Sequence, residues 1–126
     1  MDFFSSPSDG EAELCSLDKE FIDHPTATFF MRMEGHSMVN AFISDGSLLV
    51  VDRSLKPKNM DIVVATIDGE TTVRYLRKND LRSWLLPANP KFKDLSITAE
   101  SEVVVLGVVT AVVTEPKRLA ASIRPC

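Results

Sequence analysis

Downstream of residue 25 the hydrophobic positions fall in short runs rich in valine, isoleucine and phenylalanine, with turn residues between them. β-Branched and aromatic runs of roughly four to eight residues, bounded by glycine, proline, asparagine or aspartate, are typical of strands. The pattern predicts strands over residues 28–33, 47–51, 61–67, 70–77, 84–86 and 102–114. Helical periodicity is almost absent here. The sequence therefore predicts an all-β (mostly β) fold, a compact folded sheet or a barrel-like one.

Two glycine positions refine this prediction. Asp68-Gly69 separates two of the predicted strands, and this pair suits a tight type I′ hairpin because glycine tolerates a positive φ. Gly107 interrupts the long valine-rich run, and a glycine inside a strand indicates a bend or a bulge.

The first 25 residues follow a different pattern. Residues 1–13 are rich in serine, acidic residues, glycine and proline, which predicts a mobile arm. Leu14, Leu17 and Phe21 recur at helical spacing, with Ser16 placed to cap a short helix over residues 17–23 and Pro25 just beyond its end. We therefore predict an arm with one short helix over 1–25, a folded domain over 26–115 and a tail over 116–126.

The composition argues against several classes of function, among them direct DNA binding and metal binding. The 126 residues suit one domain, and the net charge of −4 argues against direct DNA binding, which needs clustered lysine and arginine. The two cysteines, Cys15 and Cys126, stand near the chain ends without a cysteine and histidine cluster, so no metal or other cofactor is predicted. No apolar run is long enough to span a membrane and no signal peptide is evident. A cytoplasmic protein is expected.

One segment breaks the strand pattern and carries candidate chemistry. Gly35-His36-Ser37-Met38 places a serine beside a glycine that permits a sharp turn. Taken alone this motif is weak, because such a serine is usually a turn residue. A serine becomes a nucleophile when a desolvated, neutral lysine on a neighbouring strand takes its proton. The predicted strand over 70–77 is the place to look, and it carries Arg74.

Several further segments complete a family pattern in chain order. They are residues 24–30, 35–38, 43–52, 61–63, 68–73, 87–89 and 107–109. Together they resemble the C-terminal peptidase domain of LexA-type self-cleaving serine peptidases, and most closely the UmuD-like subunits of error-prone DNA polymerase V. The resemblance covers roughly residues 3–114.

The resemblance assigns roles to two residues. Ser37 matches the family nucleophile, and Arg74 occupies the position of the general-base lysine. His36 stands where the family usually has aspartate. Because an arginine in a protein does not give up its proton, we expect self-cleavage to be very slow or absent. The 126 residues also contain none of the Cys-Gly or Ala-Gly bonds that the family cuts, so the chain resembles the already trimmed product.

Two other groups near the serine are weighed as substitute bases. Lys78 shares a strand face with Arg74 but lies about 13 Å further along by strand rise. His36 is adjacent to Ser37, and neighbouring side chains usually diverge. Neither is expected to replace the missing lysine.

The resemblance also implies partners. It implies a homodimer that assembles with a Y-family DNA polymerase for translesion synthesis in the SOS response to DNA damage, contacts with RecA filaments, and heterodimers with full-length relatives. Two alternatives stay open. One is an active self-cleaving peptidase that uses another base, and the other is a regulatory decoy that dimerises with LexA-like or UmuD-like relatives.

Overall fold

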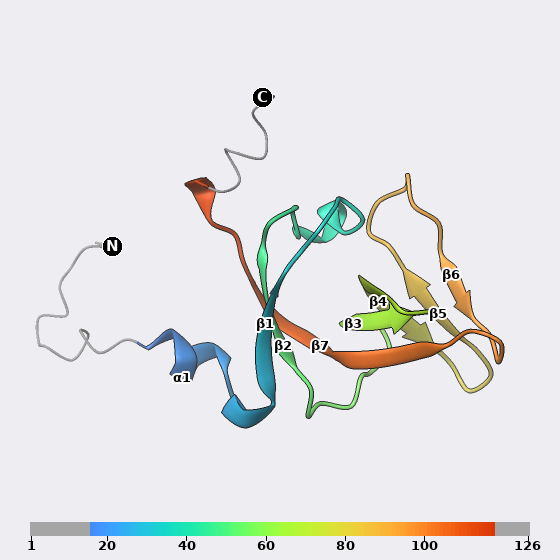
Figure 1. Cartoon of the computed structure of the whole chain (residues 1–126), viewed down its shortest axis with the longest axis horizontal. Helices are drawn as coiled ribbons and strands as arrows, with labels where there is room; N and C mark the ends of the chain where they lie inside the picture. The colour runs from blue at the N-terminus through green and yellow to red at the C-terminus, as the bar shows by residue number, and fades with distance from the viewer. Residues whose placement is uncertain (1–15, 118–126) are drawn as a thin grey trace, which may run out of the picture.

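The computed structural model describes residues 16–117, so the predicted mobile arm over 1–13 and most of the predicted tail lie outside the described residues. One short helix and seven strands make up the described part (Figure 1). In chain order they are α1 (Leu17–Phe21), β1 (Thr28–Arg32), β2 (Leu48–Asp52), β3 (Asp61–Ile67), β4 (Glu70–Lys78), β5 (Ser83–Leu86), β6 (Leu95–Ile97) and β7 (Val103–Val113). Single 3₁₀ turns lie at Pro25–Ala27 and Val39–Ala41. The predicted mostly-β fold is confirmed.

All six predicted strands are present within one or two residues of their expected bounds. Asp68 and Gly69 both have positive φ, 50° and 88°, as the type I′ hairpin requires. Sequence analysis missed β6, a three-residue strand whose side chains stay largely exposed. The predicted helix ends two residues early because Ile22 adopts an extended backbone, although Ser16 caps it as expected.

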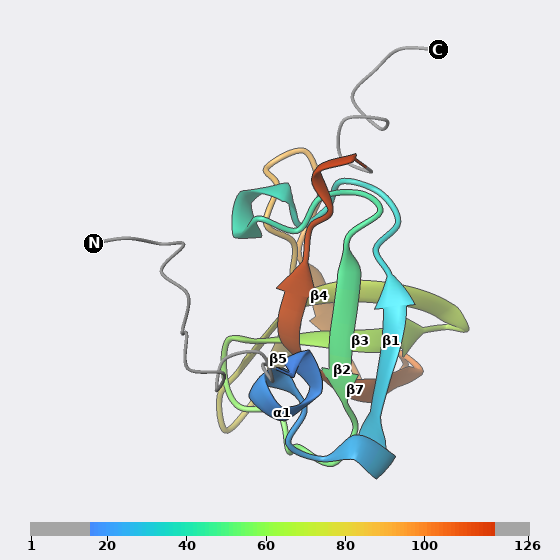
Figure 2. The same cartoon turned by 90° about the vertical axis from the view of Figure 1, so that its left-hand side faces the viewer.

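The strands form one antiparallel sheet in the order β1-β2-β7-β3-β4-β5-β6. Residues 108–113 of β7 pair with β2, whereas residues 103–108 pair with β3. β7 thus joins two wings, a first wing of β1 and β2 and a second wing of β3 to β6. The strands of the first wing run crosswise to β3 and β4, so the sheet folds over along β7 (Figure 2).

The fold in the sheet has a local cause in β7. The register shifts at Leu106 against β3 and at Thr110 against β2, and each bulge bends the strand. Gly107 lies between them, buried against the first wing. A Cβ at this position would lie 2.6 Å from Val51 Cγ1 and 3.0 Å from the main-chain oxygen of Asp52. The predicted irregularity is therefore present, and the glycine permits the close approach of the two wings.

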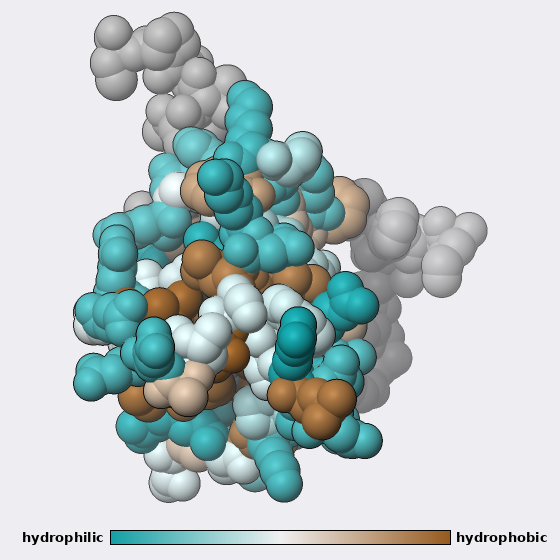
Figure 3. Space-filling model, turned by 90° about the vertical axis from the view of Figure 1, so that its right-hand side faces the viewer, coloured by the Kyte–Doolittle hydropathy of each residue, from teal (hydrophilic) through white to brown (hydrophobic). Residues whose placement is uncertain are grey.

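Two hydrophobic clusters stabilise the folded sheet. The first fills the space between the wings and contains Met33, Met38, Ile43, Leu49, Val51, Val64 and Val73. The second lies on the other face of the second wing and contains Val63, Ala65, Leu76, Leu85 and Val108. β3 contributes alternate residues to both clusters, since successive side chains of a strand point to opposite faces. Seen from the end that carries β5 and β6, apolar side chains gather in the middle, with polar ones around them (Figure 3).

An ion pair fastens the segment before β1 to the end of β2. His24 Nδ1 lies 2.6 Å from Asp52 Oδ2, and the other carboxylate oxygen of Asp52 accepts hydrogen bonds from the amide and hydroxyl of Ser54. The hydrogen bond that His24 donates to Asp52 raises the pKa of His24 above its usual 6.5. The pKa of Asp52 is lowered, chiefly by the Ser54 hydroxyl. The pair therefore holds this corner of the first wing in place.

Candidate functional site

Ser37 lies in the loop that follows β1, and the residue is 5% exposed. Contacts from two other segments hold this loop. The Gly35 amide donates to Asp45 Oδ1 at 2.8 Å, and Gly35 takes a φ of 86°. On the other side the Ala88 amide donates to the Ser37 carbonyl at 2.8 Å, and Asn89 Nδ2 donates to the His36 carbonyl at 2.7 Å. The serine is therefore fixed by its main chain, while its hydroxyl stays available.

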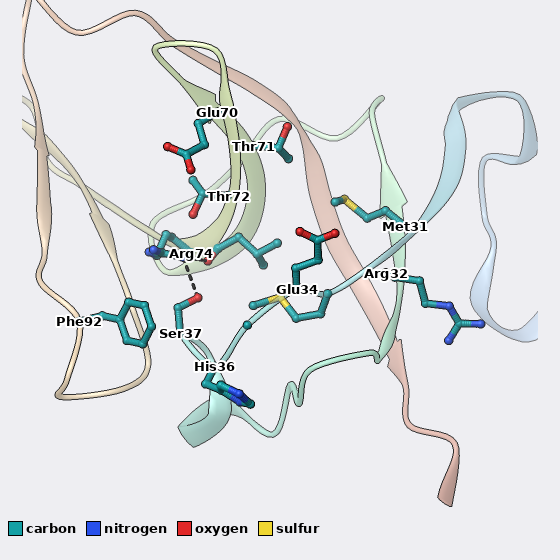
Figure 4. A pocket seen from close by; sticks show the side chains of 13 residues that line it. Met31, Arg32, Glu34, His36, Ser37, Glu70, Thr71, Thr72, Arg74 and Phe92 are labelled. Atoms are coloured by element: carbon teal, nitrogen blue, oxygen red, sulfur yellow. Dashed lines mark hydrogen bonds between the residues drawn. The ribbon is translucent and has the colours of Figure 1, made fainter. Parts of the chain in front are cut away.

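Arg74 reaches the serine from the second wing. It lies in the middle of β4, opposite Val63 of β3, and the residue is half-buried. Arg74 Nη1 donates to Ser37 Oγ at 2.8 Å and to the Val73 carbonyl at 2.7 Å. The Arg74 Cζ atom also lies 5.8 Å from the centre of the Phe92 ring. The two candidate residues, 37 positions apart in sequence, thus meet where the wings fold together (Figure 4).

The electrostatics at Arg74 are those of an unneutralised cation. Within residues 16–117 no carboxylate forms an ion pair with it. Burial lowers the pKa of the Arg74 guanidinium from its usual value, yet an arginine in a protein stays protonated at working pH. Because the guanidinium only donates hydrogen bonds, it holds the Ser37 oxygen without being able to take its proton.

Ser37 and Arg74 both line a cleft of about 420 Å³. Its walls come from the end of β1 with the following loop, from the first half of β4, and from the loop between β5 and β6. The lining residues are Met31, Arg32, Met33, Glu34, Gly35, His36, Ser37, Glu70, Thr71, Thr72, Val73, Arg74 and Phe92. The cleft is therefore larger than a single small ion needs, and its walls carry both positive and negative side chains.

Lys78 and His36, the two side chains considered as substitute bases, both lie away from the Ser37 hydroxyl. Lys78 Nζ donates to the Pro57 carbonyl at 2.9 Å, and Lys78 does not line the cleft. His36 lines the cleft, but its exposed ring points away from the Ser37–Arg74 contact (Figure 4). Neither side chain forms a hydrogen bond to Ser37 in the described part of the chain.

Sequence reasoning missed four supporting residues. Asp45, Ala88 and Asn89 hold the serine loop, and Phe92 flanks the guanidinium. Three of them fall inside segments that carried the family resemblance, which was the only available signal. Phe92 gave none, because its position near Arg74 depends on how the loop between β5 and β6 folds.

Two kinds of feature are absent from the described residues. Among them no group of three or more histidine, cysteine, aspartate or glutamate side chains is placed to hold a metal ion. The helical part of residues 16–117 contains nothing long and apolar enough to cross a membrane.

The sequence is similar to a known protein family and to several characterised proteins. A family model described as Peptidase S24-like matches residues 4–110, which include both Ser37 and Arg74. The chain is 39% identical over 123 residues to Protein ImpA of Salmonella typhimurium, covering 92% of this chain and 79% of that protein. It is 42% identical over 109 residues to Protein MucA of Escherichia coli, covering 85% and 74%. It is 44% identical over 96 residues to a LexA repressor of Parafrankia sp. (strain EAN1pec), covering 76% and 37%.

Proposed function

This chain belongs to the S24-like peptidase family, with a peptidase domain of the LexA/UmuD type, and on that basis we propose that it is a UmuD-like accessory subunit of an error-prone translesion DNA polymerase in the SOS response. In this role the peptidase fold serves for dimerising and binding. Its self-cleavage is disabled. Similarity to ImpA and MucA over most of their length supports the UmuD-like assignment over a repressor, of which this chain matches 37%.

The observation that carries the inactive-peptidase part is the 2.8 Å contact between Arg74 Nη1 and Ser37 Oγ. A family nucleophile needs an acceptor for its proton, and the group in contact with Ser37 is a permanent donor. Lys78 is engaged by the Pro57 carbonyl, which argues against rescue by that side chain.

The partners follow from the same proposal. The protein forms a homodimer in the cytoplasm and binds the catalytic subunit of a Y-family polymerase. RecA filaments and full-length UmuD-like relatives are further partners. The net charge of −4 supports an indirect role at DNA, in which the polymerase makes the contact with phosphate.

Co-purification tests the assembly directly. The full chain is expressed with an affinity tag together with a Y-family polymerase from the same genome, and in parallel with a full-length LexA-like relative. We expect the polymerase to elute with the tagged chain, and an unrelated tagged protein of similar charge to retain none. Retention of the LexA-like relative without the polymerase would replace the subunit proposal with the regulatory decoy.

A further inference from the structure

The Arg74 guanidinium has more hydrogen-bond donors than the protein uses. A guanidinium carries five N–H groups, and Nη1 supplies the two that bind Ser37 Oγ and the Val73 carbonyl. Arg74 Nε is buried and donates to no acceptor within residues 16–117. Nη2 also has no acceptor in that range but, unlike Nε, is not closed off from solvent. A protonated group of this kind favours an oxygen acceptor supplied from outside.

The serine loop adds donors of the same kind. Because Ser37 Oγ accepts a hydrogen bond from Arg74, its own hydroxyl hydrogen remains to be donated. The main-chain N–H groups of His36, Ser37 and Met38 donate no hydrogen bond in the described part of the chain. The contact between Arg74 and Ser37 thus places side-chain donors from both wings next to each other, an arrangement that favours an anionic oxygen beside them.

The charges along the cleft restrict that anion. Arg32 also lines the cleft, but its Nη1 binds Glu115 Oε1 at 2.7 Å and its side chain points away (Figure 4). Glu34 and Glu70 add two negative charges to the walls. A dianion such as phosphate meets repulsion from both glutamates, whereas a single carboxylate placed at Arg74 is attracted by the nearest charge.

The walls next to this donor cluster suit an extended chain. Residues 70–74 of β4 pair with β3 on one side, while β5 pairs only with the later residues of β4, from Tyr75 to Lys78. The second edge of residues 70–74 is therefore unpaired among the described residues and lines the cleft. An unpaired strand edge is a template for an extended peptide. Met31, Met33 and Phe92 provide apolar contacts along the same cleft.

From these two features we propose that the cleft binds the C-terminal carboxylate of an extended, mainly apolar peptide. The carboxylate lies against Arg74 and the Ser37 hydroxyl, and the preceding residues run along the free edge of β4. Arg74 thereby turns a serine-centred cleft into a receptor for a peptide end. This site needs no polymerase and no cleavage, so it stands apart from the function proposed above.

The test uses a synthetic pentapeptide, acetyl-Thr-Val-Ala-Val-Leu, with either a free carboxylate or an amide at its C-terminus. Each form is titrated into the full ¹⁵N-labelled chain and followed by NMR. We expect the acid to bind about tenfold more tightly than the amide, because a charge-assisted hydrogen bond is lost in the amide. The shifted signals should include residues 35–38 and 70–74.

Two variants sharpen the test. Arg74→Gln removes the charge and should reduce the affinity for the acid to that for the amide. Arg32→Gln is the matched control, since it removes a cleft arginine that is already paired with Glu115, and it should leave the affinity unchanged.

Three results would overturn the proposal. They are equal binding of acid and amide, no binding of either at millimolar concentration, and displacement of the acid by equimolar inorganic phosphate or acetate. The NMR spectrum shows whether Arg74→Gln folds. If it does not, the comparison of acid and amide on the unaltered chain still tests whether the cleft recognises the carboxylate.

Discussion

In the proposed function, a hydrogen-bond donor replaces a base at a single side chain, Arg74. A neutral lysine offers a lone pair to a neighbouring hydroxyl, whereas an arginine offers only N–H groups. In that proposal, the contact keeps Arg74 beside Ser37, but the hydrogen bond runs from the arginine to the serine, opposite to the direction that a general base requires. Half-burial of position 74 would favour the neutral form of a lysine there, because desolvation disfavours charge.

Arg74→Lys should restore cleavage. A full-length UmuD-like relative that carries its own cut site is supplied as substrate at mildly alkaline pH. We expect the rate of cleavage to rise about 10²–10⁴-fold over the unaltered chain, the usual contribution of a general base. The measurement is loss of substrate mass over time.

The control is the double variant that adds Ser37→Ala to Arg74→Lys, which should be as inactive as the unaltered chain. Cleavage by the unaltered chain that disappears in Ser37→Ala alone would show that another group serves as the base. Equal rates with arginine and lysine would contradict the assigned role of position 74.

A second residue-scale prediction concerns His24. Its pKa is raised in the folded chain by the hydrogen bond to Asp52, so its contribution to stability is complete below pH 6.5 and is lost as pH rises through the raised pKa. The stability difference between the unaltered chain and His24→Gln should therefore shrink as the pH rises above 6.5 and through the raised pKa. Urea unfolding at several pH values measures it.

The chain has one other histidine, and this provides the matched control. His36 is exposed and its ring has no hydrogen-bond partner among the described residues. His36→Gln should keep the pH dependence of the unaltered chain. A pH dependence that vanishes in His36→Gln and persists in His24→Gln would contradict the assignment.

At the scale of the element, β7 decides whether the site forms. Its two halves pair with different wings, and Gly107 sits where the wings come closest. The serine comes from the first wing and the arginine from the second, so the bend of β7 sets their distance.

Gly107→Ala should lower the free energy of unfolding by about 1–3 kcal/mol, the range for overpacking a buried position. The added Cβ meets Val51 and the main-chain oxygen of Asp52, and the main chain cannot move aside without disturbing β2. Val104→Ala, at an exposed position of the same strand, is the control and should stay within about 0.5 kcal/mol. An unchanged urea midpoint for Gly107→Ala would contradict the close approach.

The elements themselves were largely predictable, for physical reasons that differ between them. β3 and β4 are long, β-branched and joined by Asp68-Gly69, so pattern and turn chemistry agree. β6 has three residues and is mostly exposed, and such a strand exists only because β5 offers it an edge. α1 shows the opposite case, since its cap was predicted but Leu17 and Phe21 remain exposed rather than packed.

At the scale of the whole molecule, the proposed function requires association. The outer strands of the sheet are β1 and β6, and a UmuD-like subunit acts as a pair of chains in the proposal. Light scattering on the purified chain at tens of micromolar should give twice the mass of one chain. A single-chain mass that persists at this concentration would contradict the homodimer and favour a protein that associates only with other partners.

By itself, the sequence determined the strand pattern, the hairpin at Asp68-Gly69 and the irregularity near Gly107, which are local properties set by side-chain period and turn conformation. The family resemblance added Ser37 and Arg74 as the candidate pair. Only the tertiary structure decided the direction of the hydrogen bond between Ser37 and Arg74, the place of Phe92 beside the guanidinium, and the free edge of β4. Each of these depends on how β7 bends and brings the two wings together, and no pattern along the chain encodes the distance between residues on different wings.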